Sequence, residues 1–352
     1  MKNQLKFLAL ITLIIFASCS KDDSSDDSTD DDVVDSTYVI VNNGNGGVNS
    51  VTDANDDFPP SIAQAVPAVQ GETFSNTLPI LLFFDDKLLL PSLENNLEVT
   101  QDGEVIGGTI TINEGANGYA ILTFSPSQVF DINKTILFTL SGDVQDDGGN
   151  SFGEDYTLTF NTKAGSTGSF DNNTGFENGT QGVEFIGDGN IMDGNQGCVD
   201  PVSGNSFAAI TSGDQLISGG SAIAGASSLM ILGPINDSFT SFNFNYNFMS
   251  AEFQEFVDSE FDDSVIVTVV GPDGAHSEFL TSVNTVGTEG NTQCEGFPGL
   301  PDEGDDYGGS TGWISKTVAS GTVGSPAYVI FTITDVTDTI YSSIMALDDV
   351  SL

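Results

Sequence analysis

The chain has 352 residues and a strongly acidic balance, with 51 Asp and Glu against 7 basic residues, and its formal net charge at pH 7 is −44. This charge repels a phosphate backbone and an anionic membrane surface, so it excludes nucleic acid as a partner. Divalent cations are favoured instead, because clustered carboxylates are hard oxygen ligands. The 40 glycines, with abundant Thr, Ser, Val, Ile and Phe, are typical of β-strands joined by turns.

Residues 1–18 have the features of an export signal. Lys2 and Lys6 flank the start of an apolar stretch at 7–16, which is too short for a membrane-spanning helix, since that needs roughly 20 residues. Ala17 and Ser18 come directly before Cys19, a pattern that resembles the lipobox of bacterial lipoproteins, although Phe16 replaces the usual Leu. The resemblance implies that Cys19 carries lipid and becomes the N-terminus. An ordinary cleaved signal is the alternative.

An acidic segment follows this cysteine. The run SKDDSSDD at 20–27 resembles the tag that directs lipoproteins of Bacteroidota to the outer face of the outer membrane. Such a run repels itself and cannot bury a core, so we predict a lipidated, disordered tether over 19–55. The expected location is the outer membrane, facing the cell exterior.

Cys198 and Cys294 are the remaining cysteines. In an oxidising envelope they are best interpreted as one disulfide. Closing a loop of about 100 residues contributes on the order of 4–5 kcal/mol if the effect is the lost entropy of the unfolded chain. A zinc site needs more ligands than the single histidine, His276, and these cysteines provide.

Residues 56–163 form the first predicted module. Its apolar runs either alternate with polar residues or are continuous, and turn residues separate them. We expect strands at 80–84, 97–99, 109–112, 120–124, 136–140 and 156–160. Short strands at this spacing are the signature of a β-sandwich.

The same module contains an ordered set of motifs: PPSI at 59–62, NTLPI at 76–80, LTFSP at 122–126, VQDDGGN at 144–150 and LTFNT at 158–162. Their order resembles the SbsA-type bacterial Ig-like domain. The resemblance implies an Ig-like β-sandwich that acts as a spacer or stalk. We interpret the DDGGN run as a tight turn, since Gly supplies positive φ and Asp or Asn caps locally, with a bound cation as the alternative.

Residues 166–352 form the second predicted module. The run FNFNYNF at 242–248 has strict period 2, with aromatic residues on one face and asparagines on the other. We interpret the aromatic face as core, with a sugar-binding platform as the alternative. Further strands are expected at 265–270, 328–333 and 344–352. This patterning predicts an all-β chain in which a larger jelly-roll β-sandwich follows the Ig-like one.

Several motifs of this module also carry resemblances. FMSAEFQEFVDSEFDDS at 248–264 leads into GPDG at 271–274, and ALDDV at 346–350 follows the segment 333–343. These motifs resemble the choice-of-anchor L domains of bacterial surface proteins, with Asp262 where that family usually has Asn. GFENG at 175–179 and the terminal LDDV are similar to the two ends of carbohydrate-binding jelly rolls. In those domains the early Glu and the terminal Asp help to hold a structural Ca²⁺.

The resemblance and the clustering of acids together predict a structural Ca²⁺ site in the second module. The expected ligands are five carboxylates: Glu177, Glu252, Asp262, Asp263 and Asp348. Solvated surface acids are the alternative, and we interpret the acidic loop at 302–306 in that way. Trp313 is expected to pack at the start of a strand, with stacking on a sugar ring as the alternative.

Catalysis finds little support in the sequence. One histidine and no arginine exclude most Ser-His-Asp, Cys-His and phosphoryl-transfer designs. We therefore predict a non-catalytic surface lipoprotein whose Ig-like stalk presents the jelly roll for glycan or adhesive recognition. Its partners are then the outer membrane, through the lipid, and glycans or other surface proteins. The alternative is a structural or matrix protein with no defined ligand.

Overall fold

A computed structural model describes residues 38–352 except 69, 70, 72, 167, 214, 215, 217–226, 301–307 and 337–340. The predicted export signal at 1–18, the predicted lipidation site Cys19 and the acidic loop at 302–306 lie outside the described residues. No described helix is long and apolar enough to cross a membrane.

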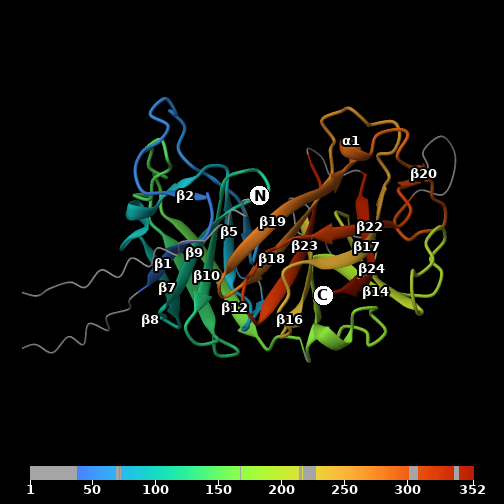
Figure 1. Cartoon of the computed structure of the whole chain (residues 1–352), viewed down its shortest axis with the longest axis horizontal. Coiled ribbons are helices and arrows are strands. Elements are labelled where there is room, and N and C mark those ends of the chain that lie inside the picture. Colours follow the sequence, from blue (N-terminus) through green and yellow to red (C-terminus); the bar gives the residue numbers. More distant parts are fainter. Residues whose placement is uncertain are drawn as a thin grey trace, which may run out of the picture.

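The first module is a β-sandwich of two five-stranded sheets (Figure 1). What we call the junction sheet contains, in order, β1 (Val39–Asn42), β9 (Gly108–Glu114), β10 (Ala120–Pro126), β5 (Ile80–Phe84) and β3 (Ile62–Val66). The far sheet contains β4 (Thr73–Ser75), β12 (Tyr156–Lys163), β11 (Thr135–Leu140), β7 (Leu97–Gln101) and β8 (Glu104–Val105). Two short strands, β2 (Gly47–Val48) and β6 (Leu88–Leu89), pair beside them, and the 3₁₀ turn η1 (Leu90–Leu93) follows.

The strand β1 corrects the predicted boundary of the tether. Residues 39–42 pair in parallel with β9, and residues 47–48 pair with β6, so part of the segment assigned to a disordered linker over 19–55 belongs to the sandwich. The Tyr38 hydroxyl also accepts a hydrogen bond from the Val99 N–H at 2.9 Å. The reason is local composition, because Tyr38 opens a short β-branched run that favours a strand.

The second module is a larger β-sandwich. Its inner sheet contains β13 (Val183–Ile186), β16 (Ser227–Ile235), β23 (Ala327–Thr334), β18 (Ser264–Gly271) and β19 (Gly274–Ser282). Its outer sheet contains β14 (Asp188–Asp193), β15 (Ser206–Thr211), β24 (Ser343–Ser351), β17 (Phe242–Ser250), β21 (Gly309–Ser310) and β20 (Thr292–Gln293), with β22 (Ile314–Val318) also paired to β17. The only described helical pieces here are η2 (Phe170–Asn172) and α1 (Val283–Val286).

The strands expected from periodicity are all present, so the predicted all-β fold of two sandwiches is confirmed. The FNFNYNF run forms most of β17, and its aromatic side is core as interpreted. Phe242, Phe244 and Phe248 are buried between the inner and outer sheets. The DDGGN run is the expected tight turn, in which the Asn150 N–H donates to Asp146 Oδ1 at 2.8 Å and Gly149 has a φ of 89°.

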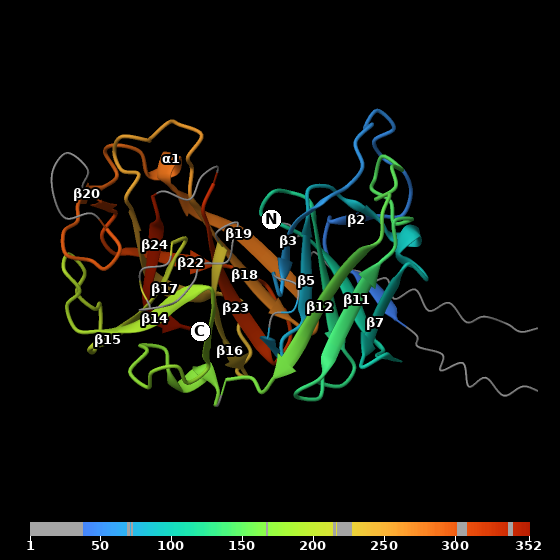
Figure 2. The ribbon, with the colours of Figure 1, turned by 180° about the vertical axis from the view of Figure 1, so that it is seen from behind.

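The two sandwiches share an apolar interface, because the junction sheet packs face to face on the inner sheet (Figures 1 and 2). One continuous apolar cluster joins the first sandwich to residues of the second: Ile186, Leu229, Ile231, Val270, Ala275, Tyr328 and Ile330. Their chain neighbours Met230, Val329 and Phe331 point instead into the core of the second sandwich. The inner sheet is therefore buried on both faces, and the molecule is a stack of four sheets.

Polar contacts close the edges of this junction. The Tyr328 hydroxyl donates to the Thr77 carbonyl at 3.2 Å, and the Ala275 N–H donates to Asn113 Oδ1 at 3.0 Å. Lys163 Nζ lies 2.7 Å from Glu184 Oε1, across the link between the modules. The modules are thus held by directional contacts as well as by apolar area.

We predict that the two modules unfold together. Leu81 alternates with the core residues Leu82 and Ile80 on β5, so its buried side chain faces the junction. Leu81→Ala should lower the free energy of unfolding by about 2–5 kcal/mol. The loss should appear in the fluorescence of Trp313, the one tryptophan of the chain, which lies in the second module.

Urea unfolding followed by Trp313 fluorescence measures this coupling. Leu137→Ala is the control, because Leu137 lies on the solvent side of the far sheet, and it should barely move the midpoint. Independent unfolding of the modules would give a different result. The urea midpoint of the Trp313 fluorescence would then be the same in Leu81→Ala and wild type, and circular dichroism would report a separate, earlier transition.

Candidate functional site

The face of the outer sheet that points away from the core is divided into a covered and an open half. The covered half is apolar, and loops pack over it. Phe207, Met249, Ile344 and Ala346 of the sheet form a buried cluster there with loop residues that include Phe297 and Leu300. The open half lies where β22, β17 and β24 run side by side.

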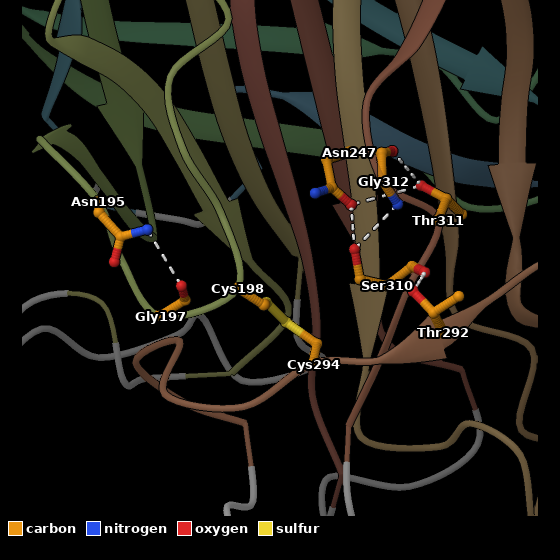
Figure 3. The surroundings of a disulfide bond; sticks show 9 residues. All are labelled: Asn195, Gly197, Cys198, Asn247, Thr292, Cys294, Ser310, Thr311 and Gly312. Carbon is orange, nitrogen blue, oxygen red and sulfur yellow. Dashed lines mark hydrogen bonds between the residues drawn. A yellow bond between two sulfur atoms is a disulfide. The ribbon is translucent and has the colours of Figure 1, made fainter.

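A disulfide joins Cys198 to Cys294 and so links two of the loops that pack over the covered half, one that contains Cys198 and one that contains Cys294 (Figure 3). This confirms the predicted pairing, and the Cα atoms lie 5.2 Å apart. The loops approach so closely that a Cβ on Gly197 would lie 2.2 Å from the Gly296 carbonyl carbon, and Gly197 has a φ of 63°. Glycine is therefore required at this position on both steric and conformational grounds.

The segment 195–206, called here the rim loop, forms the border between the two halves. Asp348 of β24 is buried, and its Oδ2 accepts from the N–H groups of Val202 at 2.7 Å and Ser203 at 3.0 Å. Burial raises the pKa of Asp348, an effect that these N–H donors oppose. Glu177 Oε1 accepts from the N–H groups of Asn205 and Ser206 at 2.7 and 2.8 Å.

Trp313 lies at the border of the open half, directly before β22. Its Nε1–H donates to the Asp200 carbonyl of the rim loop at 2.7 Å, and its ring meets Phe207 edge to face at 6.0 Å. The predicted packing role is confirmed by these contacts. Because the side chain is only half-buried, part of the indole also remains accessible beside the open half.

The open half carries two cross-strand rows of hydrogen-bonding side chains, called here the ladder face. Five of its six members are exposed and Asn245 is half-buried: Asn243, Asn245, Ser315, Thr317, Asp349 and Ser351. The period of the FNFNYNF run predicts that the asparagines share a polar face, but by itself it gives them no role. The alternation of Trp313, Ser315 and Thr317 was the missed signal, since period 2 puts all three on one face.

The five predicted calcium ligands do not gather in one place. Glu177 and Asp348 both hold the rim loop, whereas Asp262 Oδ1 accepts from the Asn284 N–H at 2.7 Å in the first turn of α1. Asp263 is buried and accepts from the Ser212 hydroxyl at 3.0 Å and the Val336 N–H at 2.9 Å, and Glu252 is also buried. Glu177, Asp262, Asp263 and Asp348 thus accept hydrogen bonds from the fold itself. Calcium binding by the five residues stays a prediction.

Within the described residues, three other carboxylates do converge, at one end of the first sandwich. One oxygen from each of Asp56, Asp86 and Asp146 lies within 4.8 Å of the others. Burial raises the pKa of Asp86 to about 7, and the nearby Asp56 and Asp147 carboxylates contribute to the increase, while the Lys87 N–H opposes it. The DDGGN turn thus brings Asp146 into an acidic cluster, which is where the alternative cation interpretation had pointed.

Comparison with known proteins identifies the first module. Residues 56–162 match the family of bacterial Ig-like domains. No curated protein matches the chain.

Among solved structures, the chain is similar to the carbohydrate-binding module TmCBM61, solved with β-1,4-galactotriose, at 10% identity and a TM-score of 0.29, covering 52% of this chain and 95% of that one. It is also similar to the K1 cleaved adhesin domain of Lys-gingipain from Porphyromonas gingivalis, at 13% identity and a TM-score of 0.25, covering 51% and 95%. A Bacteroides uniformis β-glucuronidase matches at 12% identity and a TM-score of 0.19, covering 84% of this chain and 30% of the enzyme. None of these TM-scores reaches 0.5, so these similarities carry no conclusion about function.

The acidic cluster predicts a pH dependence of stability. An acid whose pKa is higher in the folded state binds its proton more tightly there, so stability falls as pH rises between the two pKa values. For Asp86 this window runs from about 4 in the unfolded chain to about 7 in the folded one. Asp86→Asn should flatten this part of the profile and make the protein more stable than wild type above pH 7.

Urea midpoints between pH 4 and 8 test this expectation. Glu98→Gln is the control, since Glu98 is an exposed acid on β7, outside the cluster, and its removal should leave the slope in place. A wild-type slope that persists unchanged in Asp86→Asn would contradict the assignment to Asp86.

Proposed function

We propose that this chain is a non-catalytic, lipid-anchored protein of the bacterial surface whose second sandwich binds glycan. The observation that carries the proposal is the open half of the outer sheet, where a half-buried indole lies beside six hydrogen-bonding side chains. Binding sites generally combine aromatic or apolar contact area with a few fixed polar groups. A sugar ring offers the complement, because it has an apolar face and a rim of hydroxyls.

The chemistry of this face supports binding rather than catalysis. Its polar groups are amides, hydroxyls and one carboxylate, Asp349. Glycoside hydrolysis generally uses a pair of carboxyl groups that flank the scissile bond. The adjacent Asp348 is buried, and backbone N–H groups occupy both of its carboxylate oxygens.

The proposed anchoring rests on the N-terminal sequence. The apolar stretch at 7–16, Cys19 and the acidic run after it are the features of an exported lipoprotein displayed outside the cell. The Ig-like module then lies between the anchor and the glycan-binding sandwich. Calcium as a structural ion remains part of the proposal, so the binding experiments are run with Ca²⁺ and with EDTA.

One observation supports the alternative of a structural surface protein without a defined ligand. The aromatic side chains of 242–248 are buried in the core of the second sandwich, so they form no exposed platform for sugars. On this alternative the ladder face is a solvated sheet surface. Glycan binding decides between the two.

Trp313→Ala should weaken glycan binding at least tenfold, because it removes the aromatic contact area beside the ladder face. Glycan arrays with the chain from residue 20 identify the bound sugars, and titration calorimetry then measures affinity. Phe58→Ala is the matched control, since Phe58 is the most exposed large hydrophobic residue described, at 78%, and lies in the first module.

Each outcome of this experiment has a defined meaning. Binding that Trp313→Ala loses and Phe58→Ala keeps supports the proposed site, and its loss in EDTA would support a calcium requirement. If folded wild-type protein binds no glycan, either with Ca²⁺ or with EDTA, the result contradicts the glycan proposal and favours the structural alternative.

Cys19→Ala should release the protein from the membrane fraction, because lipid attachment needs the cysteine thiol. Fractionation of expressing cells by centrifugation and immunoblotting measures the shift, and Cys198→Ala serves as a control that removes a different cysteine. Equal membrane retention of Cys19→Ala and wild type would contradict lipid anchoring.

A further inference from the structure

The ladder face has an internal repeat. Each of its two rows crosses three strands and joins a hydroxyl, an asparagine amide and an acceptor in the same order. In the first row the Thr317 hydroxyl donates to Asn243 Oδ1 at 2.6 Å, and Asn243 Nδ2 donates to the Ser351 hydroxyl at 3.4 Å. In the second row the Ser315 hydroxyl donates to Asn245 Oδ1 at 2.5 Å, and Asn245 Nδ2 donates to Asp349 Oδ2 at 3.3 Å.

The spacing of the rows follows from strand geometry. Asn243 pairs with Thr317, and Asn245 pairs with Ser315, across the antiparallel β17 and β22. The rows are therefore two residues apart along the strand, which is about 6.7 Å. Trp313 lies two residues before Ser315 on the same side of the edge strand β22. The Trp313 indole, the Ser315 hydroxyl and the Thr317 hydroxyl therefore lie in one line. A regular line of this kind suits a ligand that itself repeats.

Each row retains hydrogen-bonding capacity toward solvent. An asparagine amide nitrogen has two hydrogens, and the row uses one of them. A Ser or Thr hydroxyl that donates within the row still has lone pairs that accept. Every row thus offers a donor and an acceptor outward, held in position by the row itself, which reduces the entropy lost on binding. Sugar hydroxyls both donate and accept, so they match this pattern.

The charges around the ladder face select among sugars. The face contains one carboxylate and no cation, and the chain as a whole carries −44. Lys316 lies between Ser315 and Thr317 in sequence, but it points to the other side of the strand, where its ammonium group binds Glu278 Oε1. Uronate or sulfate groups would therefore meet repulsion and no counter-charge.

We infer that the ladder face binds a neutral, linear polysaccharide that runs along β22 and β17. One sugar lies against Trp313, and the following sugars bind the Ser315–Asn245–Asp349 row and then the Thr317–Asn243–Ser351 row. This inference rests on the proposed glycan-binding function and specifies its ligand class. The ligand lies on the fourth and outermost sheet of the stack, on the side away from the Ig-like module.

Titration calorimetry of the chain from residue 20 tests the inference with neutral cello-, xylo-, manno- and galacto-oligosaccharides of two to six residues. Affinity for the bound series should rise with length until the oligosaccharide spans Trp313 and both rows, and then level off. Asn243→Ala and Asn245→Ala should each weaken binding of the longer members about tenfold, the effect of one well-placed hydrogen bond. Asn243→Ala should leave the shortest binding member nearly unchanged, because that ligand does not reach its row.

Asn161→Ala is the matched control. Asn161 of the far sheet accepts from the Thr135 hydroxyl at 3.0 Å in a similar exposed pair, so its removal should leave affinity unchanged. The melting temperature of each variant establishes that it is folded. An oligogalacturonate series should bind at least tenfold more weakly than the neutral one.

The outcomes separate this inference from the function on which it rests. If wild type binds glycan and Trp313→Ala loses it, but neither asparagine variant changes affinity, the polysaccharide lies elsewhere and the inference is overturned while the proposed function stands. Stronger binding of the uronate series, or affinity that does not depend on length, also overturns it. No glycan binding by folded wild type overturns both.

Discussion

The junction sheet of the Ig-like module and the inner sheet of the second sandwich bury their facing sides against each other, and the remaining architecture is arranged around that contact. It extends the apolar cluster of the first sandwich onto the facing side of the inner sheet, and it makes β5 and β10 strands that are buried on both faces. Apolar area removed from water contributes roughly 25 cal/mol per Å², so a sheet-sized contact outweighs the polar contacts at its edges. The Ig-like module is therefore a fixed part of the fold rather than a loosely joined spacer.

The same contact determines which surface is left to meet a ligand. The inner sheet is buried on both faces. Among the described strands of the second sandwich, a sheet face that points away from the Ig-like module is therefore left on the outer sheet. Loops fastened by Cys198–Cys294 cover half of that face. Asp348 and Glu177 then hold the rim loop at the border, and Asp200 orients the Trp313 indole there. The open half is polar, and hydrogen bonds between the side chains of neighbouring strands cross it.

Much of the fold was accessible from local patterns, because periodicity reports burial. The continuous runs at 80–84 and 120–124 predicted strands, and burial of both faces explains why they do not alternate. The disulfide followed from the cysteine count and the expected compartment. The surroundings of the five carboxylates predicted to bind calcium were harder to predict from the sequence. Carboxylates that lie near one another in sequence, or that match a family pattern, can each accept hydrogen bonds from a different part of the fold. Here they cap a helical turn, hold the rim loop and lie in the buried interior.

The sequence by itself determined the acidic charge, the all-β class and the side of β17 that faces the core, because each depends on composition or on neighbours along the chain. Only the tertiary structure decided what the opposite side of each strand, the side that points away from its own sandwich core, faces. Thr111 and Thr123 alternate with core residues and would be exposed in an isolated sandwich, yet both are buried at the junction, and their hydroxyl oxygens have no hydrogen-bond partner among the described residues. Likewise Asn243 and Asn245 acquire their partners from strands about 70 and 100 residues later. Periodicity can place residues on one side of a strand, but it does not show which distant strands meet. The junction and the rows of the ladder face therefore emerge only from the fold.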